Sequence, residues 1–251
     1  MKKILVYITL LLVVTHCMTQ EIPNNFTFIP SGYTYVDDVK IYVDSFYIQK
    51  YEVTNREMRA FKAYLKDHDT VLLRKFNVIM SKDDIVKPFL HLYYDDYHRN
   101  EKYDNFPVVH ITHEVAQLYC DWLTKKYQQT MGDHITVTLP SRVQWMRAAK
   151  GDHPQDVFSW GTNSHTDKEG NMLGNFNTTQ KPTIDSVGSF PPNEFGVYDM
   201  SGNVAEMTNR HGISMGGHWH QSPSDATTAS IFRYNYISPM VGLRPIIIIL
   251  K

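Results

Sequence analysis

The chain has only two cysteines among its 251 residues, Cys17 and Cys120. Cys17 lies close to the amino terminus, so removal of the first twenty residues would leave Cys120 alone and exclude an intrachain disulfide. Cys120 falls on the apolar face of a predicted helix, where a cysteine is typically a buried, inert thiol. A disulfide-stapled domain is therefore excluded.

The chain also lacks an excess of charge of either sign. Lys and Arg number 25 and Asp and Glu number 26, which gives a formal net charge of −1. No basic cluster is longer than two or three residues. Electrostatic attraction to nucleic acid or to anionic lipid is therefore excluded as the basis of function, and nucleic acid is not an expected partner.

No apolar run is long enough to span a bilayer. Met1-Lys2-Lys3 precedes the run from Ile4 to Val14, which has the length of a signal-peptide core. We therefore predict that residues 1–20 are an export signal and that residues 21–251 form one domain. Cys17 follows the run as the lipidated cysteine of a bacterial lipoprotein does, although His16 stands where such signals prefer a small residue. The alternative is ordinary cleavage near Gln20, so the predicted location is the periplasm, the outer membrane as a lipoprotein, or the exterior.

Capping boxes mark two helices, and a capping threonine marks a third. Thr54 with Glu57 predicts a helix to about Lys66, and Ser141 with Gln144 predicts one through Ala149. Thr112 predicts a helix that reaches Gln129. Alternation or β-branched runs predict strands within 26–49, 135–139, 213–219 and 243–250.

Residues 67–105 are charged and aromatic, and we interpret them as a surface excursion with a little helix, held down by aromatic packing. Its tyrosines either cover the core or form a platform for a sugar or peptide; they are Tyr93, Tyr94, Tyr97 and Tyr103.

Residues 195–207, FGVYDMSGNVAEM, combine glycine turns with Asp, Asn and Glu oxygens. Such a segment is either a loop around a hard cation or a turn whose polar groups satisfy local backbone.

This segment resembles the F-G-L-Y-D-M-x-G-N-V-W-E-W signature of the formylglycine-generating enzyme (sulfatase-modifying factor) family. Five further stretches resemble other motifs of that family in the same order; they are FYIQKYEVTNREMRAF at 46–61, FPVVHITHEVAQLYCDWL at 106–123, LPSRVQWMRAAKG at 139–151, VGSFPPN at 187–193 and GGHW at 216–219. The resemblance implies an α+β, C-type-lectin-like fold with little regular structure. It thereby accounts for the loop-rich stretch 151–194, which is long for a compact domain.

The resemblance also identifies this chain as a divergent member of the family. The family's enzymes oxidise a substrate cysteine to formylglycine with a copper ion held by two cysteines, whose positions here are Gln221 and Ala226. Cu(I) requires soft ligands, and an amide or a methyl group cannot replace a thiolate. Formylglycine-generating activity is not expected.

Two calcium sites are implied by the same resemblance. The first would use Asn203 and Glu206 with the carbonyl of Val204, all oxygen donors suited to Ca²⁺. The second would use Asn175 and Phe176, but the D-G-Y/F segment that completes it is missing here.

Three histidines offer a different metal site. His218 replaces the serine of the family's G-G-S-W motif, and with His211 and His220 it gives H-x6-H-x-H. Strand alternation would put His218 and His220 on one face, where they could share a zinc, copper or iron ion. Ordinary polar surface roles are the alternative.

These observations leave two hypotheses. The first is an exported, non-catalytic binding or structural component of a bacterial envelope, by analogy with lipoproteins of gliding-motility and type IX secretion machinery. Its partner would be an envelope protein or peptide, with carbohydrate as an alternative, and membrane contact would come through a lipid anchor alone. The second is a metal-dependent oxidoreductase that uses the histidines.

Overall fold

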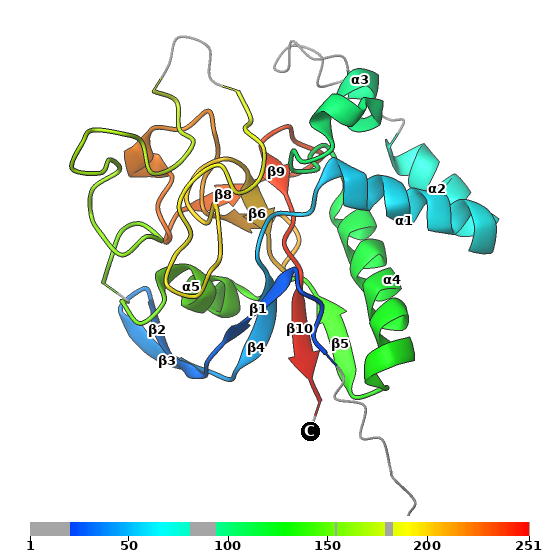
Figure 1. Ribbon diagram of the computed structural model, residues 1–251, viewed down its shortest axis with the longest axis horizontal. Helices are drawn as coiled ribbons and strands as arrows, with labels where there is room; N and C mark the ends of the chain where they lie inside the picture. Colours follow the sequence, from blue (N-terminus) through cyan, green and yellow to red (C-terminus); the bar gives the residue numbers. More distant parts are fainter. Residues whose placement is uncertain (1–20, 81–93, 154, 179–182, 251) are drawn as a thin grey trace, which may run out of the picture.

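The computed structural model describes residues 21–80, 94–153, 155–178 and 183–250. The export signal, Cys17 and Tyr93 lie outside the described residues. A four-stranded antiparallel sheet crosses the molecule in the order β1 (Phe26–Ile29), β4 (Phe46–Gln49), β10 (Ile246–Ile249) and β5 (Ile135–Thr138). The fold is mixed helix and sheet, as expected (Figure 1).

Helices cover both faces of this sheet. On one face, α4 (His113–Met131) packs with α1 (Asn55–His68) against Val137 and Ile247. On the other, α5 (Arg142–Lys150) packs against Ile48 and Ile246, and the hairpin of β2 (Gly32–Val36) and β3 (Val39–Val43) lies beside it. The first two residues of β10 are therefore fully buried.

A second four-stranded sheet contributes Glu206 to the candidate site. Its order is β8 (Ile231–Arg233), β7 (Ile213–Met215), β6 (Ala205–Met207) and β9 (Val241–Gly242), and β6 pairs with β9 in parallel. Between α5 and β6 the described residues form no helix and no strand beyond one isolated bridge, as expected for the loop-rich stretch.

The predicted helix starts are confirmed. Thr54 and Ser141 both form complete capping boxes, and the Thr112 hydroxyl accepts the N–H of Val115. No helix in the described part of the chain is both long and apolar enough to cross a bilayer.

Two predictions of local structure were wrong. Residues 67–105 contain more helix than expected, because α2 (Thr70–Met80) packs on α1 and α3 (Tyr94–Arg99) precedes a short 3-10 turn (Glu101–Tyr103). The strand predicted over 213–219 ends at Met215. Gly216 and Gly217 follow it with φ of 89° and 71°, a left-handed conformation that leaves the strand and favours glycine.

Candidate functional site

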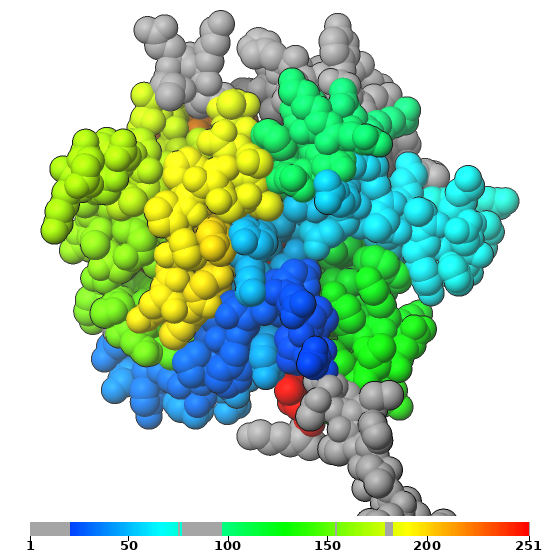
Figure 2. All heavy atoms as spheres, in the orientation of Figure 1, coloured from blue at the N-terminus to red at the C-terminus, as the bar shows by residue number. Residues whose placement is uncertain are grey.

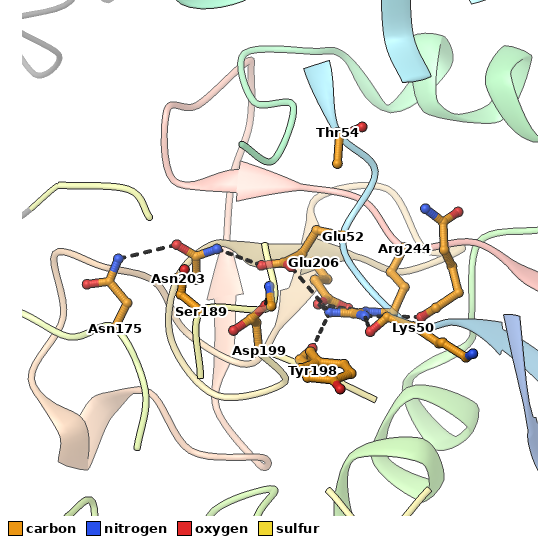
Figure 3. Close-up of polar contacts among 12 residues, drawn as sticks. Lys50, Glu52, Thr54, Asn175, Ser189, Tyr198, Asp199, Asn203, Glu206 and Arg244 are labelled. Atoms are coloured by element: carbon orange, nitrogen blue, oxygen red, sulfur yellow. Dashed lines mark hydrogen bonds and ion pairs between the residues drawn. The ribbon is translucent and has the colours of Figure 1, made fainter. Parts of the chain in front are cut away.

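Three carboxylates and one arginine lie together in the core (Figure 3). Glu52 follows β4, Asp199 lies in the loop before β6, Glu206 lies in β6, and Arg244 precedes β10. Their exposed fractions are 0%, 6%, 1% and 0%. If all four were ionised the cluster would carry two uncompensated negative charges, which is costly in a buried environment.

Arg244 compensates Glu206. Its Nε lies 2.9 Å from both carboxylate oxygens of Glu206, and its Nη2 lies 2.6 Å from Oε1. Trp145 donates to Oε2 at 2.6 Å. Each oxygen of Glu206 thus accepts two donors, which fills the capacity of the carboxylate.

The remaining N–H groups of Arg244 hold the backbone around the cluster. Nη1 donates to the carbonyls of Gln49 and Lys50, and Nη2 donates to the carbonyl of Tyr198 at 2.8 Å. One side chain therefore connects the end of β4, the 195–200 loop and β6.

The charges of Glu52 and Asp199 are less well compensated than the charge of Glu206. Glu52 accepts a hydrogen bond from Asn203 Nδ2 at 2.9 Å through Oε1, and Asp199 Oδ2 accepts the N–H of Gly188 at 2.5 Å. Glu52 Oε2 accepts no hydrogen bond from a described residue but forms an ion pair with Arg244 Nη2 at 3.7 Å, and no described donor hydrogen-bonds to Asp199 Oδ1. Burial, reinforced by the charge of Asp199, holds the pKa of Glu52 well above its usual range. Burial raises the pKa of Asp199 to about 6.

The two predicted calcium ligands do not converge on one cation. Asn203 adopts φ 53° and uses its Oδ1 to accept from Asn175 Nδ2 at 3.2 Å and from the N–H of Asp185 at 3.1 Å. Glu206 is saturated by Arg244 and Trp145. Asn175 and Asn203, assigned to separate calcium sites from the sequence, contact each other directly.

The side chains of the other two predicted calcium residues pack in apolar clusters. Val204 belongs to an apolar cluster with Trp219 and Ile184, and Phe176 packs with Phe158. The side-chain oxygens of Asn203 and Glu206 are thus engaged by protein donors, and the two calcium sites stay predictions. Within the cluster, the oxygens with capacity for a cation are those of Glu52 and Asp199.

The positions that correspond to the copper-binding cysteines lie side by side at Gly217. A methyl group built on Gly217 would overlap Ala226 and would lie 3.1 Å from Gln221 Oε1. Gln221 Oε1 accepts the N–H of His218 at 3.1 Å, and Ala226 is fully buried against Phe158 and Phe176. The site thus has an amide and a methyl group where thiolates would be needed, and one of the two positions is closed to solvent.

The predicted histidine site is not assembled in the described part of the chain. His218 and His220 lie in the turn after β7 rather than on one strand, so the alternation argument fails. His218 Nδ1 accepts the N–H of His220 at 3.3 Å, and burial lowers the pKa of His218 to about 4. The Nδ1 lone pair of His218 is therefore engaged by the backbone of His220.

His211 is elsewhere. Its ring meets that of His113 edge-on at 5.3 Å, while His113 donates from Nε2 to the carbonyl of Thr208 at 2.9 Å. No group of three or more His, Cys, Asp or Glu side chains among the described residues is placed to hold a metal ion.

Two tyrosines of the 67–105 segment, Tyr97 and Tyr103, cover the core. Tyr97 and Tyr103 are buried, and the Tyr97 hydroxyl donates to the carbonyl of Pro107 at 2.6 Å. Burial removes both rings from a surface platform.

The comparison with protein families decides the relationship. The family described as sulfatase-modifying factor enzyme 1-like domain matches residues 18–245 of the chain. The chain belongs to this family. Inactive Cα-formylglycine-generating enzyme 2 of Bos taurus is 32% identical over 109 residues, which cover 41% of the chain and 32% of that protein.

A catalytic relative matches over a longer stretch at lower identity. Formylglycine-generating enzyme of Bos taurus is 24% identical over 200 residues, 68% of this chain and 50% of that protein. The chain thus spans between about a third and a half of these curated members of the family.

Solved structures show the same fold. CarF superposes with a TM-score of 0.67 at 18% identity, covering 89% of this chain and 98% of its own. PvdO from Pseudomonas aeruginosa gives 0.64 at 17% identity, covering 88% and 93%. At this identity the likeness concerns architecture alone.

Three members of the cluster were not predicted as site residues from the sequence: Glu52, Trp145 and Arg244. Glu52 and Trp145 lie within stretches that resemble family motifs, and Glu52 and Arg244 are buried charged residues next to apolar strands. That combination is the signal that could have found them.

Proposed function

We propose that this chain is an exported, non-catalytic member of the family and acts as a binding or structural component of a bacterial cell envelope. The observation that carries the proposal is the pairing of Gln221 with Ala226 around Gly217. The positions have stayed together, but neither residue supplies a soft ligand or a nucleophile. The match to a relative named as inactive supports the same conclusion.

Export and lipidation are supported by the amino-terminal sequence. The short apolar core after Lys2-Lys3 and the cysteine that follows it suit a lipoprotein signal. Lipidation at Cys17 would hold the domain at a membrane and leave its surface available to an envelope protein, a peptide or a glycan.

Calcium also enters as a proposal, with changed ligands. Glu52 and Asp199 each carry an oxygen without a hydrogen-bond donor in a cluster of three carboxyl groups and one arginine, and carboxylate oxygens suit Ca²⁺. Metal analysis after dialysis, and thermal melting with calcium or with chelator, tests this. We expect calcium to raise the melting temperature and the Glu52→Gln, Asp199→Asn double variant to lose that response. A calcium response that survives in the double variant would remove these residues from the site.

The catalytic conclusion is tested with a cysteine-containing sulfatase peptide. Purified protein is loaded with Cu(I), incubated with the peptide under oxygen, and the peptide mass is followed for conversion to the aldehyde. A catalytic formylglycine-generating enzyme serves as the positive control. We expect no conversion by this chain, and aldehyde formation above the copper-only background would overturn the proposal.

A further inference from the structure

One end of the first sheet carries apolar side chains that no helix in the described part of the chain covers. On β1 and β4, Phe28 lies opposite Tyr47, with ring centroids 5.2 Å apart. On β10, Ile249 follows Ile247, the cross-strand partner of Tyr47, by two positions and so lies on the same face. We call Phe28, Tyr47 and Ile249 the apolar strip.

The strip continues the core face of the sheet beyond the reach of α4. Phe26, two residues before Phe28, is buried and meets Tyr127 of α4 edge-on at 6.1 Å. Ile247 is likewise fully buried, whereas Phe28 is 50% exposed and Ile249 46% exposed. The next residue along the chain, Leu250, is 51% exposed. The alternation that fills the core thus runs out into solvent at this edge.

The described chain begins beside this edge. Ile22 packs on the cluster that contains Ile247 and Ile135, and Ile135 is the cross-strand partner of Ile249. Figure 2 shows the first described residues, in deep blue, next to the last ones, in red, at the lower edge of the molecule. In Figure 1 the end of β10 lies at the same edge, whereas β9 lies toward the other side.

The length of chain that precedes Glu21 restricts what this edge can face. Cys17 lies four residues before Glu21, and four residues reach at most about 14 Å when fully extended. A lipid on Cys17 would place that residue at the boundary of the hydrocarbon core, and the headgroup region outside it is roughly 5–8 Å thick. Glu21 would therefore lie at most about 6–9 Å beyond the outer surface of the headgroups. The face from which the chain leaves must then be the one turned toward the membrane.

We propose that the apolar strip is the membrane-facing surface of the anchored protein and rests in the headgroup region of the bilayer. The inference rests on the proposed lipidation of Cys17. Apolar and aromatic side chains at this depth gain free energy from burial without spanning the membrane. The near-zero net charge of the chain fits a contact that is apolar rather than electrostatic.

The experiment uses the full-length lipoprotein in phosphatidylethanolamine and phosphatidylglycerol vesicles. Single cysteines are introduced as Phe28→Cys or Ile249→Cys and labelled with an environment-sensitive fluorophore. Cys120 does not compete for the label, because burial raises the pKa of its thiol and leaves it 3% exposed. The matched control is Tyr236→Cys, an 85% exposed position in the segment between β8 and β9.

We expect the label at residue 28 or 249 to shift to the blue and to be quenched by brominated lipid, with no change at residue 236. A label at 28 and 249 that stays in water, while the protein floats with the vesicles, would overturn the proposed surface and leave the anchor intact. Blue shift in the Cys17→Ser variant, in buffer without vesicles or detergent, would also overturn it, because a second copy or another segment would then cover the strip.

The anchor is judged separately. Failure of the protein to float with vesicles, together with an amino-terminal peptide of unmodified mass, would refute the lipidation on which the inference rests. The Cys17→Ser variant gives the reference behaviour for an unanchored protein.

Discussion

Replacing Arg244 with methionine should destabilise the fold severely. The substitution keeps much of the apolar volume and removes the one cation among three buried carboxylates. Breaking a buried pair by removing one partner costs about 3–5 kcal/mol, because an unpaired charge remains in the core. For a domain of this length that corresponds to a fall of roughly 6–20 °C in melting temperature.

The pH dependence identifies the cause. Without Arg244, the pKa values of Glu52 and Asp199, already raised by burial, lie further above those of the unfolded chain. The native variant then binds more protons than its unfolded state, so its stability falls as pH rises from about 4. Acidification should therefore narrow the gap between variant and wild type.

The assay is urea unfolding followed by circular dichroism at about pH 7.5 and pH 5. Arg142→Met is the matched control, because its bidentate pair with Asp37 lies at the surface and should matter far less. The Arg244→Met, Glu206→Gln double variant should recover part of the loss, since it removes one of the stranded charges. A loss below about 1 kcal/mol in the single variant, or a gap that does not narrow at low pH, would refute the reasoning.

Three further predictions concern single side chains of the two sites. Asp199→Asn in the presence of chelator should raise the free energy of unfolding at about pH 7.5 by up to about 3 kcal/mol. The reason is that the pKa of Asp199 is raised from 3.8 to about 6, so the wild type loses stability as pH rises through that interval. Urea unfolding measures the difference, which should be small at about pH 4. Ala226→Cys should resist thiol reagents in the native protein while Gln221→Cys reacts, as measured by thiol titration; equal reactivity would contradict the burial of residue 226. Gly217→Ala should destabilise by about 1–3 kcal/mol in thermal melting, because of its φ of 71° and its contact with residue 226; a neutral substitution would contradict the close approach.

The sequence predicts the helix starts because their determinants are local. Thr54 with Glu57 and Ser141 with Gln144 satisfy the first backbone N–H groups within four residues of chain, and the structure contains both capping boxes. The α+β fold and the loop-rich middle followed from the family resemblance rather than from periodicity. Local propensity could not locate the end of β7, because Gly216 and Gly217 turn the chain in order to approach Trp145 and Ala226.

The candidate site depends on contacts that are distant in sequence, and here the predictions were weaker. Arg244 reaches Glu206 across 38 residues and the carbonyl of Gln49 across 195. The sequence identifies Glu206 and Asn203 as possible oxygen ligands. It does not show that Trp145 and Arg244 donate hydrogen bonds to Glu206, or that Asn175 donates one to Asn203. Likewise, the spacing of His218 and His220 favours a shared metal only if both lie on one strand, but β7 ends at Met215.

The residues around Gly217 and those around Arg244 have one feature in common, which is that their polar groups bind the protein itself. Around Gly217 the positions for copper ligands have been filled by an amide that binds backbone and by a methyl group that completes an aromatic cluster. Around Arg244 the buried charges hold together the end of β4, the 195–200 loop and β6, which are the segments that shape the neighbouring turn. Buried polar groups that hydrogen-bond to the backbone of the same chain hold its loops in one conformation, which suits the presentation of a fixed surface. Both sets of contacts therefore hold the chain's own backbone in place around this turn.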